Sequence, residues 1–444
     1  MIVDRRRVFL LAAGDFCILL ISLWLALSFR KLTFPSPGYF LANAVPFVPL
    51  FLLSLAVFYI AGLYEKQTRP ILRVMGVRIL GAQIATVIIG ALIFFFLPLS
   101  IEPRAILVLY LLISVLAESL WRTSHLRNAP LASTGEEALL IGKGPAVEEL
   151  YEEVHENPRY LITFAARIDS GLHEHDLAQY VQQKITEGIR ILVVDASDAS
   201  VVAALAALYA SLPEQVQTID FASLYEEVFD RVPLDHQDPV RLGEAVPRSR
   251  TMYDTSKRLF DVLVSFAGGI IVFPVVLLAA LAVATSGTAP LIRPARIGRD
   301  LKAIRLYKLR TMLFDDKGDP ELQKKNRVTS VGKFLRKTRI DELPQLLNVF
   351  AGDLSFIGPR PEIPNIVAVY EREIPFYRMR HTIIPGLSGW AQIHDYDAPR
   401  GPADIARTRK KLSFDLYYLK HRSIWLDLEI ALKSARALLA FSGT

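Results

Sequence analysis

The sequence predicts a multidomain membrane protein: an α-helical transmembrane bundle, an α/β module, and a mainly helical α+β domain with a re-entrant membrane helix. Three observations support this fold class. Hydrophobic residues make up 52% of the 444 residues, and four long apolar runs lie in the first quarter of the chain. Strand-like and helix-like segments then alternate. Finally, a fifth apolar run, interrupted by Pro274, precedes the C-terminal part.

The length of the chain suits two or three domains. We expect a transmembrane domain at residues 1–128, an α/β domain with its linker at 129–249, and a third domain at 250–444. The net charge of +6 would suit nucleic acid, but the hydrophobic content favours a lipid bilayer, so we expect no nucleic-acid partner. The only cysteine, Cys17, lies in an apolar run, which excludes internal disulfides and thiolate metal sites.

Four apolar runs form the predicted bundle, at residues 8–29, 42–63, 79–97 and 105–120. Each approaches the roughly 20 residues that a helix needs to cross a bilayer. Arginines precede the first run, so a cleaved signal peptide is the alternative there, but its apolar core is too long and three more runs follow. Basic residues concentrate on one side of the bundle, which places both of its ends in the cytoplasm. They are Arg5, Arg6, Arg7, Lys66, Arg69, Arg73, Arg78, Arg122 and Arg127.

The fifth apolar run, about residues 259–284, contains Gly268, Gly269 and Pro274. A proline inside a helix removes a backbone hydrogen bond and clashes with the preceding turn, so the helix should bend or break. Basic residues flank the run on both sides, which favours a segment that enters the membrane and returns to the same face. A kinked fifth span is the alternative, but it would place the following domain outside the cell, away from cytoplasmic nucleotides.

The segment from 137 to 221 alternates strands and helices in the order βαβαβ, which predicts a small parallel sheet with Rossmann-like winding. The turn at residues 142–144, Gly-Lys-Gly, is similar to a dinucleotide fingerprint, but Val147 stands at the third glycine position. Asp169 lies near the end of the second strand, where an acid would contact a ribose. Because one glycine is missing, we favour a structural or regulatory module over a cofactor site.

Two adjacent acids, Asp341 and Glu342, open an apolar helical pattern that ends at Gly352. The pattern predicts Asp341 at or beside a helix N-cap, where free amides and the helix dipole keep a carboxylate ionised and attract phosphate. Helix capping alone is the alternative interpretation. An ionised carboxylate that faces a phosphoryl group is a potential nucleophile, and its neighbour could bind Mg²⁺ together with phosphate oxygens.

Basic residues surround the acid pair in sequence. The stretch GPRP at residues 358–361 forms a rigid turn that presents the guanidinium of Arg360. Upstream, IGRDLKAIRLYKLRTM supplies Arg299, Lys308 and Arg310. These side chains are candidate phosphate ligands, and the alternatives are a solvated basic face or contact with anionic lipid.

Residues 257–444 resemble the bacterial sugar transferases, the monotopic phosphoglycosyl transferases. KRLFDVLVSF with the following proline resembles the re-entrant helix of this family, and IGRDLKAIRLYKLRTM its basic stretch. RKTRIDELPQLLNVFAGDLSFIGPRPE is similar to its central signature, and PGLSGWAQI and KLSFDLYYLKHRSIWLDLEI to its C-terminal part. The preceding bundle and α/β module resemble the large members that initiate exopolysaccharide, O-antigen or capsule synthesis.

The resemblance implies transfer of a hexose-1-phosphate from a UDP-sugar, UDP-galactose or UDP-glucose, to undecaprenyl phosphate. It implies that Asp341 is the nucleophile that forms a covalent phosphosugar as UMP leaves, and that Glu342 and Asp341 bind Mg²⁺. It further implies a homodimer in the bacterial inner membrane with its catalytic domain in the cytoplasm. The implied phosphate and nucleotide contacts are Arg299, Lys308, Arg310, Arg360 and Arg380.

Some features leave alternatives open. The family often has serine before the helix-breaking proline, whereas Phe273 precedes Pro274 here, so the bend and the partner of the freed carbonyl stay open. The aromatic tail suits either an interfacial amphipathic helix or packing against the catalytic domain.

Two other functions compete with sugar-phosphate transfer. The first is an NAD-dependent nucleotide-sugar dehydratase or epimerase, because Tyr180 with Lys184 and Tyr253 with Lys257 show Tyr-x-x-x-Lys spacing. That spacing arises easily by chance, and no intact glycine fingerprint accompanies it. The second is a non-catalytic scaffold for polysaccharide assembly, which the intact acids and arginines argue against.

Overall fold

The computed structural model describes residues 5–61, 63–64, 80–86, 103–128, 136–157, 160, 162–169, 174–199, 201–203, 206, 213, 215–237, 242–243, 250–285, 289–314, 326–394 and 404–439. The chain divides into two compact units. The first contains Met1–Glu137 and Glu153–Thr163, and the second contains Ala138–Glu152 and Phe164–Thr444.

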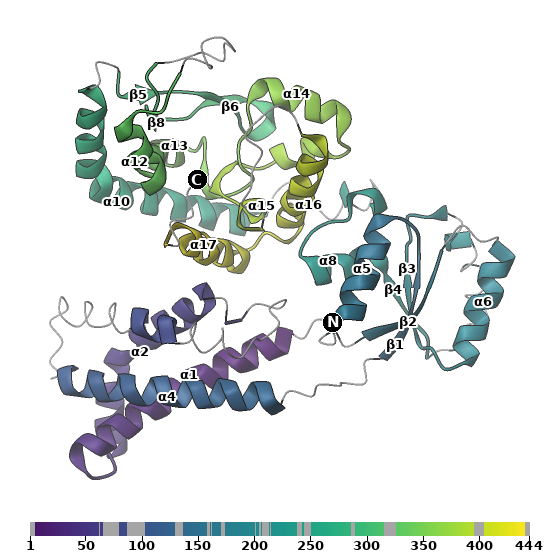
Figure 1. Cartoon of the computed structure of the whole chain (residues 1–444), viewed down its shortest axis with the longest axis horizontal. Helices are drawn as coiled ribbons and strands as arrows, with labels where there is room; N and C mark the ends of the chain where they lie inside the picture. The colour runs from purple at the N-terminus through teal and green to yellow at the C-terminus, as the bar shows by residue number, and fades with distance from the viewer. Residues whose placement is uncertain are drawn as a thin grey trace. The chain divides into compact units, whose positions relative to one another are not determined.

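The first unit contains the helices α1 (Arg5–Lys31), α2 (Pro37–Ile60) and α4 (Pro103–Asn128) (Figure 1). Leu10–Lys31 and Pro37–Ile60 are long and apolar enough to cross a membrane. The predicted fourth run lies within α4. The predicted third run lies largely outside the described residues, although residues 80–86 are helical. Apolar side chains from all three helices form the core of the bundle, among them Leu19, Leu23, Phe47, Phe51 and Tyr110.

A buried ion pair crosses this bundle. Asp15 on α1 is fully buried and accepts hydrogen bonds from Arg122, from Trp121 Nε1 at 3.1 Å and from Tyr64 Oη at 2.5 Å. Arg122 also donates to the backbone oxygen of Leu63 at 2.9 Å. A charge in an apolar interior is stable only when it is paired and hydrogen-bonded, so these contacts fix α1 against α4.

The α/β part contains β1 (Glu136–Ile141), β2 (Ile162–Ile168), β3 (Ile191–Val194) and β4 (Gln217–Asp220). The strand order is β2-β1-β3-β4, and β3 pairs in parallel with both β1 and β4. Figure 1 shows α5 (Pro145–Glu156) and α6 (Glu174–Thr186) on opposite faces of the sheet. The two central strands are apolar and buried over Ala138–Ile141 of β1 and throughout β3, as expected where helices cover both faces of a parallel sheet.

The glycine turn after β1 packs against the chain's own His236. Gly144 has φ = +102°, a conformation that favours glycine, and a Cβ added to it would lie 3.5 Å from His236 Nε2. The other ring nitrogen, Nδ1, lies 2.6 Å from the buried Asp195 carboxylate, which follows β3. The glycine turn that is similar to a dinucleotide fingerprint is therefore in contact with the short 3₁₀ segment Leu234–His236.

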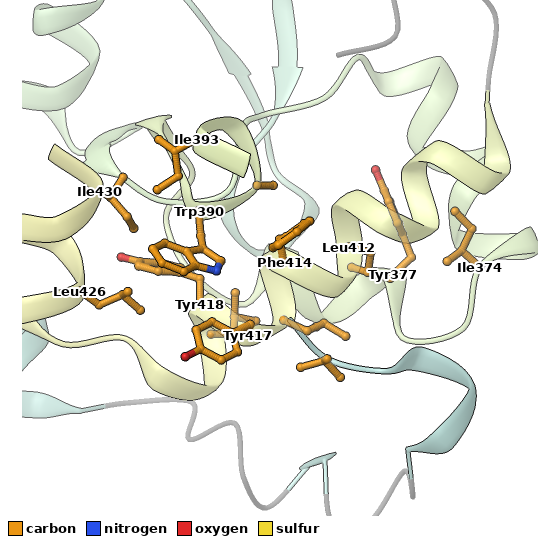
Figure 2. Close-up of a cluster of buried hydrophobic side chains, with 14 of the residues drawn as sticks. Ile374, Tyr377, Trp390, Ile393, Leu412, Phe414, Tyr417, Tyr418, Leu426 and Ile430 are labelled. Atoms are coloured by element: carbon orange, nitrogen blue, oxygen red, sulfur yellow. The ribbon is translucent and has the colours of Figure 1, made fainter. Parts of the chain in front are cut away.

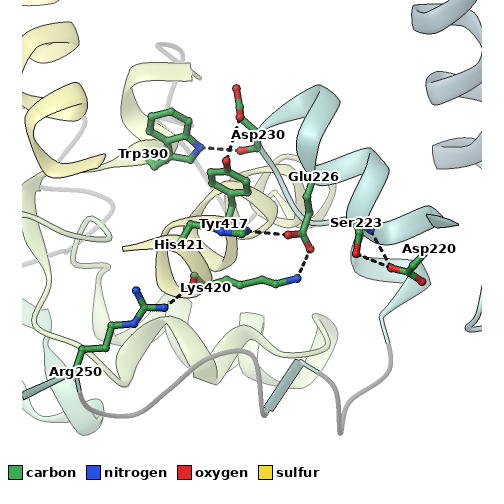
Figure 3. Close-up of polar contacts among 9 residues, drawn as sticks. All are labelled: Asp220, Ser223, Glu226, Asp230, Arg250, Trp390, Tyr417, Lys420 and His421. Atoms are coloured by element: carbon green, nitrogen blue, oxygen red, sulfur yellow. Dashed lines mark hydrogen bonds and ion pairs between the residues drawn. The ribbon is translucent and has the colours of Figure 1, made fainter. Parts of the chain in front are cut away.

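Polar contacts join the helix α8 (Phe221–Phe229) to the C-terminal part (Figure 3). Glu226 accepts hydrogen bonds from Lys420 Nζ at 2.9 Å and from His421 Nε2 at 3.0 Å. Just after α8, the backbone oxygen of Asp230 accepts a hydrogen bond from Trp390 Nε1 at 2.7 Å. These contacts explain why the α/β part and the C-terminal part belong to one compact unit.

The C-terminal part surrounds short two-stranded sheets with helices. Two of the sheets, β5 (Leu291–Ile292) with β8 (Lys308–Leu309) and β6 (Ala295–Ile297) with β7 (Ala303–Arg305), are antiparallel, and β9 (Ser355–Ile357) with β10 (Gly386–Ser388) is parallel. The 3₁₀ segments are η2 (Arg299–Leu301), η3 (Ile340–Gln345) and η4 (Tyr377–His381). The helices are α10 (Thr251–Ala284), α12 (Ser330–Thr338), α13 (Leu346–Ala351), α14 (Pro364–Glu373), α15 (Trp390–His394), α16 (Ile405–His421) and α17 (Ile424–Leu439).

The core of this part is formed by aromatic and aliphatic side chains of α15, α16 and α17 (Figure 2). Phe414, Tyr417 and Tyr418, all in the aromatic tail, are buried there, which fits the packing alternative for α16. Trp425 at the start of α17 differs, because 79% of its surface is exposed.

The fifth apolar run forms α10, which extends from Thr251 to Ala284 as one continuous helix through Pro274. Of the two expected outcomes, a bend or a break, the helix is not broken, and Figure 1 shows α10 changing direction along its length. Its first half contacts α13, where Arg258 donates to the carbonyls of Val349 and Phe350. Its last turns pack on α12 and β8, so both halves rest on the same domain. Its other faces expose large apolar side chains, including Leu263, Phe266, Ile270, Ile271 and Leu278.

Candidate active site

The two acids lie on η3, where the lysine of β8 bridges them. Asp341 is buried, with only 2% of its surface exposed. Lys308 Nζ lies 3.0 Å from Asp341 Oδ2 and 3.1 Å from Glu342 Oε1. Because β8 is held by its pairing with β5, the backbone from which the Lys308 side chain extends is fixed in place. The structure therefore brings together three of the predicted site residues.

The local structure around Asp341 differs from the expected helix N-cap. Arg339 ends α12 in the left-handed conformation, with φ = +60°, and η3 starts at the next residue. The α-helical turn begins only at Leu346, after Pro344. Lys308, rather than a capping amide, thus supplies the positive partner of the Asp341 carboxylate. The prediction of an N-cap was wrong because α12 and η3 are joined without an extended residue between them.

One oxygen of Asp341 is left without a partner. Oδ1 is buried and accepts no hydrogen bond from the residues that the structure describes. A buried carboxylate oxygen without a hydrogen-bond donor lowers the stability of the folded protein, and a catalytic role is one of the reasons that native proteins contain such atoms. Oδ2 contacts Lys308, so one oxygen of the Asp341 carboxylate has a cationic partner, and the other is left uncommitted, without a hydrogen bond among the described residues.

The cations around Glu342 favour the ionised form of its carboxyl group. Arg360 Nη2 lies 3.7 Å from Glu342 Oε1, on the same oxygen that Lys308 contacts. Burial favours the neutral acid, but the charges of Lys308 and Arg360, with a smaller effect of Arg339, outweigh it and lower the pKa of Glu342. Glu342 thus lies close to Lys308 and Arg360, whereas Asp341 contacts Lys308.

The turn that carries Arg360 is fixed by its backbone. Gly358 donates its N–H to the Ser388 oxygen at 2.8 Å, and Gly386 donates to the Pro359 oxygen at 3.0 Å. A Cβ added to Gly358 would lie 2.7 Å from the Ile384 oxygen, closer than real Cβ atoms approach. Only glycine therefore permits this close pairing of the segments around β9 and β10.

Arg380, predicted as a nucleotide contact, is buried below this turn. Its Nη2 donates to the Arg360 oxygen at 3.0 Å and lies 2.8 Å from Asp415 Oδ2, and its Nη1 donates to Glu362 Oε1 at 3.3 Å. Glu362 also pairs with Lys411. Burial opposes ionisation of Glu362, but Lys411 and Arg380 outweigh it and lower its pKa to about 2. The structure thus gives Arg380 contacts that position Arg360.

The other two predicted cations differ in their surroundings. Arg310 follows Lys308 by two residues, and its Nε is buried without a hydrogen-bond partner among the described residues. Arg299 lies on η2 with an exposed side chain, 3.6 Å from Asp300 Oδ2. Among the described contacts, none joins Arg299 to the acid pair.

Comparison with known proteins gives the family. The family model for bacterial sugar transferases matches residues 252–441. The chain is 38% identical over 183 residues to the exopolysaccharide production protein PSS of Rhizobium leguminosarum, covering 39% of this chain and 90% of that protein. This chain belongs to the bacterial sugar transferase family.

Larger relatives match over part of their length. A UDP-N-acetylgalactosamine-undecaprenyl-phosphate N-acetylgalactosaminephosphotransferase of Aeromonas hydrophila is 39% identical over 229 residues, 49% of this chain and 51% of that protein. A UDP-glucose:undecaprenyl-phosphate glucose-1-phosphate transferase of Klebsiella pneumoniae is 42% identical over 179 residues, 39% of this chain and 38% of that protein. The matched region spans about half or less of these curated relatives.

Asn348 is a further site residue in this bacterial sugar transferase that the sequence reading missed. It is fully buried on α13, where its Oδ1 accepts the N–H of Tyr307 at 2.9 Å and its Nδ2 donates to the Arg305 oxygen at 2.8 Å. These two hydrogen bonds join α13, the helix after the acid pair, to Arg305 and Tyr307, which lie just before Lys308 in the chain. A polar residue within an apolar helical pattern was the signal that could have identified it.

The acid pair supplies too few ligands to bind Mg²⁺ alone, so a substrate phosphate would have to supply the others. Among the residues that the structure describes, no group of three or more His, Cys, Asp and Glu side chains is placed to bind a metal ion. Mg²⁺ is commonly bound by one or two carboxylates together with substrate phosphates, and the adjacent carboxylates of Asp341 and Glu342 supply that kind of donor set.

Proposed function

We propose that this chain transfers a hexose-1-phosphate from a UDP-sugar to undecaprenyl phosphate and releases UMP. The main support is the carboxylate of Asp341, which is buried, anchored through one oxygen by Lys308 and uncommitted at the other. The names of the Aeromonas and Klebsiella relatives contain both substrate classes. The cations Lys308, Arg310 and Arg360 suit a diphosphate donor.

In the first step, Asp341 Oδ1 attacks the phosphorus that bears the sugar. The new O–P bond forms as the bond to the bridging oxygen breaks, and the electron pair leaves on the phosphate of UMP. In the second step, a phosphate oxygen of undecaprenyl phosphate attacks the same phosphorus. The aspartyl O–P bond then breaks, which restores the carboxylate and gives undecaprenyl-diphosphate-sugar. Lys308 and Arg360 offset the charge that develops on the phosphoryl oxygens.

We assign Mg²⁺ binding to Glu342, with Asp341 as a second ligand. The ion, when bound, supplies Lewis-acid stabilisation of phosphate charge. Glu342 stays ionised for this purpose because its pKa is lowered by Lys308 and Arg360 in spite of burial.

The membrane arrangement is part of the same proposal. Four N-terminal spans anchor the chain in the bacterial inner membrane, and α10 enters and leaves on the cytoplasmic face. Both halves of α10 rest on one domain while its other faces expose apolar side chains, which supports re-entry. The active site then lies where a soluble donor meets a lipid phosphate. The β2-β1-β3-β4 sheet is a Rossmann-like structural or regulatory module, and the protein acts as a homodimer.

The donor sugar is glucose or galactose, in the first membrane step of exopolysaccharide, O-antigen or capsule synthesis. Glucose is named for the Klebsiella relative, whereas the Aeromonas relative is named for N-acetylgalactosamine. The test is UMP release by the purified full chain with undecaprenyl phosphate, Mg²⁺ and a panel of UDP-sugars. We expect release with one hexose donor and none in Asp341→Asn, whereas Glu373→Gln on the exposed side of α14 should match the wild type. UMP release in Asp341→Asn at the wild-type rate would exclude this mechanism.

A further inference from the structure

Arg296 is a further cation, on a strand that is hydrogen-bonded to the segment of Arg360. Arg296 is on β6, and its side chain is partly buried. Its Nη1 donates to the carbonyl of Ala295 at 2.9 Å. Among the residues that the structure describes, no carboxylate forms an ion pair with it. Arg296 is thus a partly buried arginine that has no carboxylate partner among the described residues.

Backbone hydrogen bonds join the strand of Arg296 to the segment of Arg360 and to the segment that leads into Lys308. The N–H of Ile297 donates to the Glu362 oxygen at 2.9 Å, which joins β6 to the segment of Arg360. The N–H of Leu306 donates to the Pro294 oxygen at 3.1 Å, which joins it to the chain that leads into Lys308. Burial and the charge of Arg360 lower the pKa of Arg296, and the charges of Glu362 and Glu342 only partly oppose this.

The nearby acids already have cationic partners. Glu342 is shared by Lys308 and Arg360, and Glu362 is shared by Lys411 and Arg380. Two like charges that are partly withdrawn from water repel each other, and a bound anion removes that repulsion. The donor of the proposed reaction carries two adjacent phosphates.

We propose that Arg296, together with Arg360, binds the donor phosphate that leaves with the nucleoside. Lys308 contacts Asp341 and is therefore placed at the phosphorus that is attacked, whereas Arg360 contacts Glu342, and Arg296 lies on the strand whose next residue, Ile297, is hydrogen-bonded to Glu362. Negative charge gathers on the leaving phosphate as the bridging P–O bond breaks, so a guanidinium pair there stabilises the transition state. This inference rests on the proposed function.

The experiment measures binding of UDP and UMP to the full chain by calorimetry, in an Asp341→Asn background that prevents turnover. Arg296→Gln should weaken both ligands about tenfold or more, because a charge-assisted hydrogen bond to their shared phosphate is lost. Arg296→Lys should recover part of the affinity. Arg305→Gln, an exposed arginine on the paired strand β7, is the matched control and should bind both ligands like its parent.

The outcomes separate this inference from the proposed function. Unchanged UDP and UMP affinity in Arg296→Gln, with the melting temperature retained, would overturn the role of Arg296. Weaker UDP binding with unchanged UMP binding would overturn the assignment to the leaving phosphate. If the wild type neither bound UDP nor released UMP from any UDP-sugar, the proposed function itself would fail.

Discussion

Replacing Lys308 with methionine tests the electrostatics of the acid pair. Lys308 Nζ contacts Asp341 Oδ2 at 3.0 Å and Glu342 Oε1 at 3.1 Å, and its side chain is 26% exposed. A hydrogen bond to a charged group contributes about 1.5–3 kcal/mol. The loss of one such bond in the transition state lowers kcat/KM about ten- to a hundredfold. Only one hydrogen bond of Lys308 enters this figure. In the proposed reaction the ammonium group gives up one carboxylate contact and gains one contact to a phosphate oxygen.

The same variant should change the pH profile. In the wild type, Lys308 is the largest of the influences that lower the pKa of Glu342, and burial acts in the opposite direction. Without Lys308, burial raises this pKa, so Glu342 becomes protonated at a higher pH. The acidic limb of kcat/KM for UMP release should therefore move to higher pH in Lys308→Met and stay in place in Lys308→Arg. Wild-type activity with an unchanged acidic limb in Lys308→Met would refute the assigned electrostatics.

Three other variants test the surroundings of the acid pair. Glu342→Gln should weaken the Mg²⁺ response of UMP release, and an unchanged Mg²⁺ titration would remove Glu342 from the proposed metal site. Arg380→Met should lower the free energy of unfolding by about 3–5 kcal/mol, because it leaves Glu362 and Asp415 buried with less countercharge; wild-type denaturant stability would contradict this. Gly358→Ala should reduce kcat at least tenfold by displacing the turn before Arg360. Full activity in that variant would show that the close backbone approach is dispensable.

The grouping of the acid pair with its cations could be predicted from the sequence because the residues lie in a few short motifs. Asp341, Glu342, Lys308 and Arg360 do converge in the structure. The α/β part was also predictable, since its apolar strands alternate with amphipathic helices, and β1, β3 and β4 pair in parallel as expected.

Other features depend on partners that are distant in sequence. Arg380 was predicted as a nucleotide contact, but it is buried and forms an ion pair with Asp415, which lies on α16. The 3₁₀ conformation of η3 depends on the left-handed residue Arg339, which a helical pattern does not reveal. Likewise, the contact of His236 with the glycine turn joins segments about ninety residues apart.

The most direct test of the central claim is peptide mass spectrometry of the wild-type protein incubated with donor UDP-sugar and no lipid acceptor. We expect a hexose-phosphate mass addition on the peptide that contains Asp341, which disappears when undecaprenyl phosphate is added. The same addition on another side chain, or its persistence in Asp341→Asn, would contradict the claim that the uncommitted oxygen of Asp341 carries the phosphosugar.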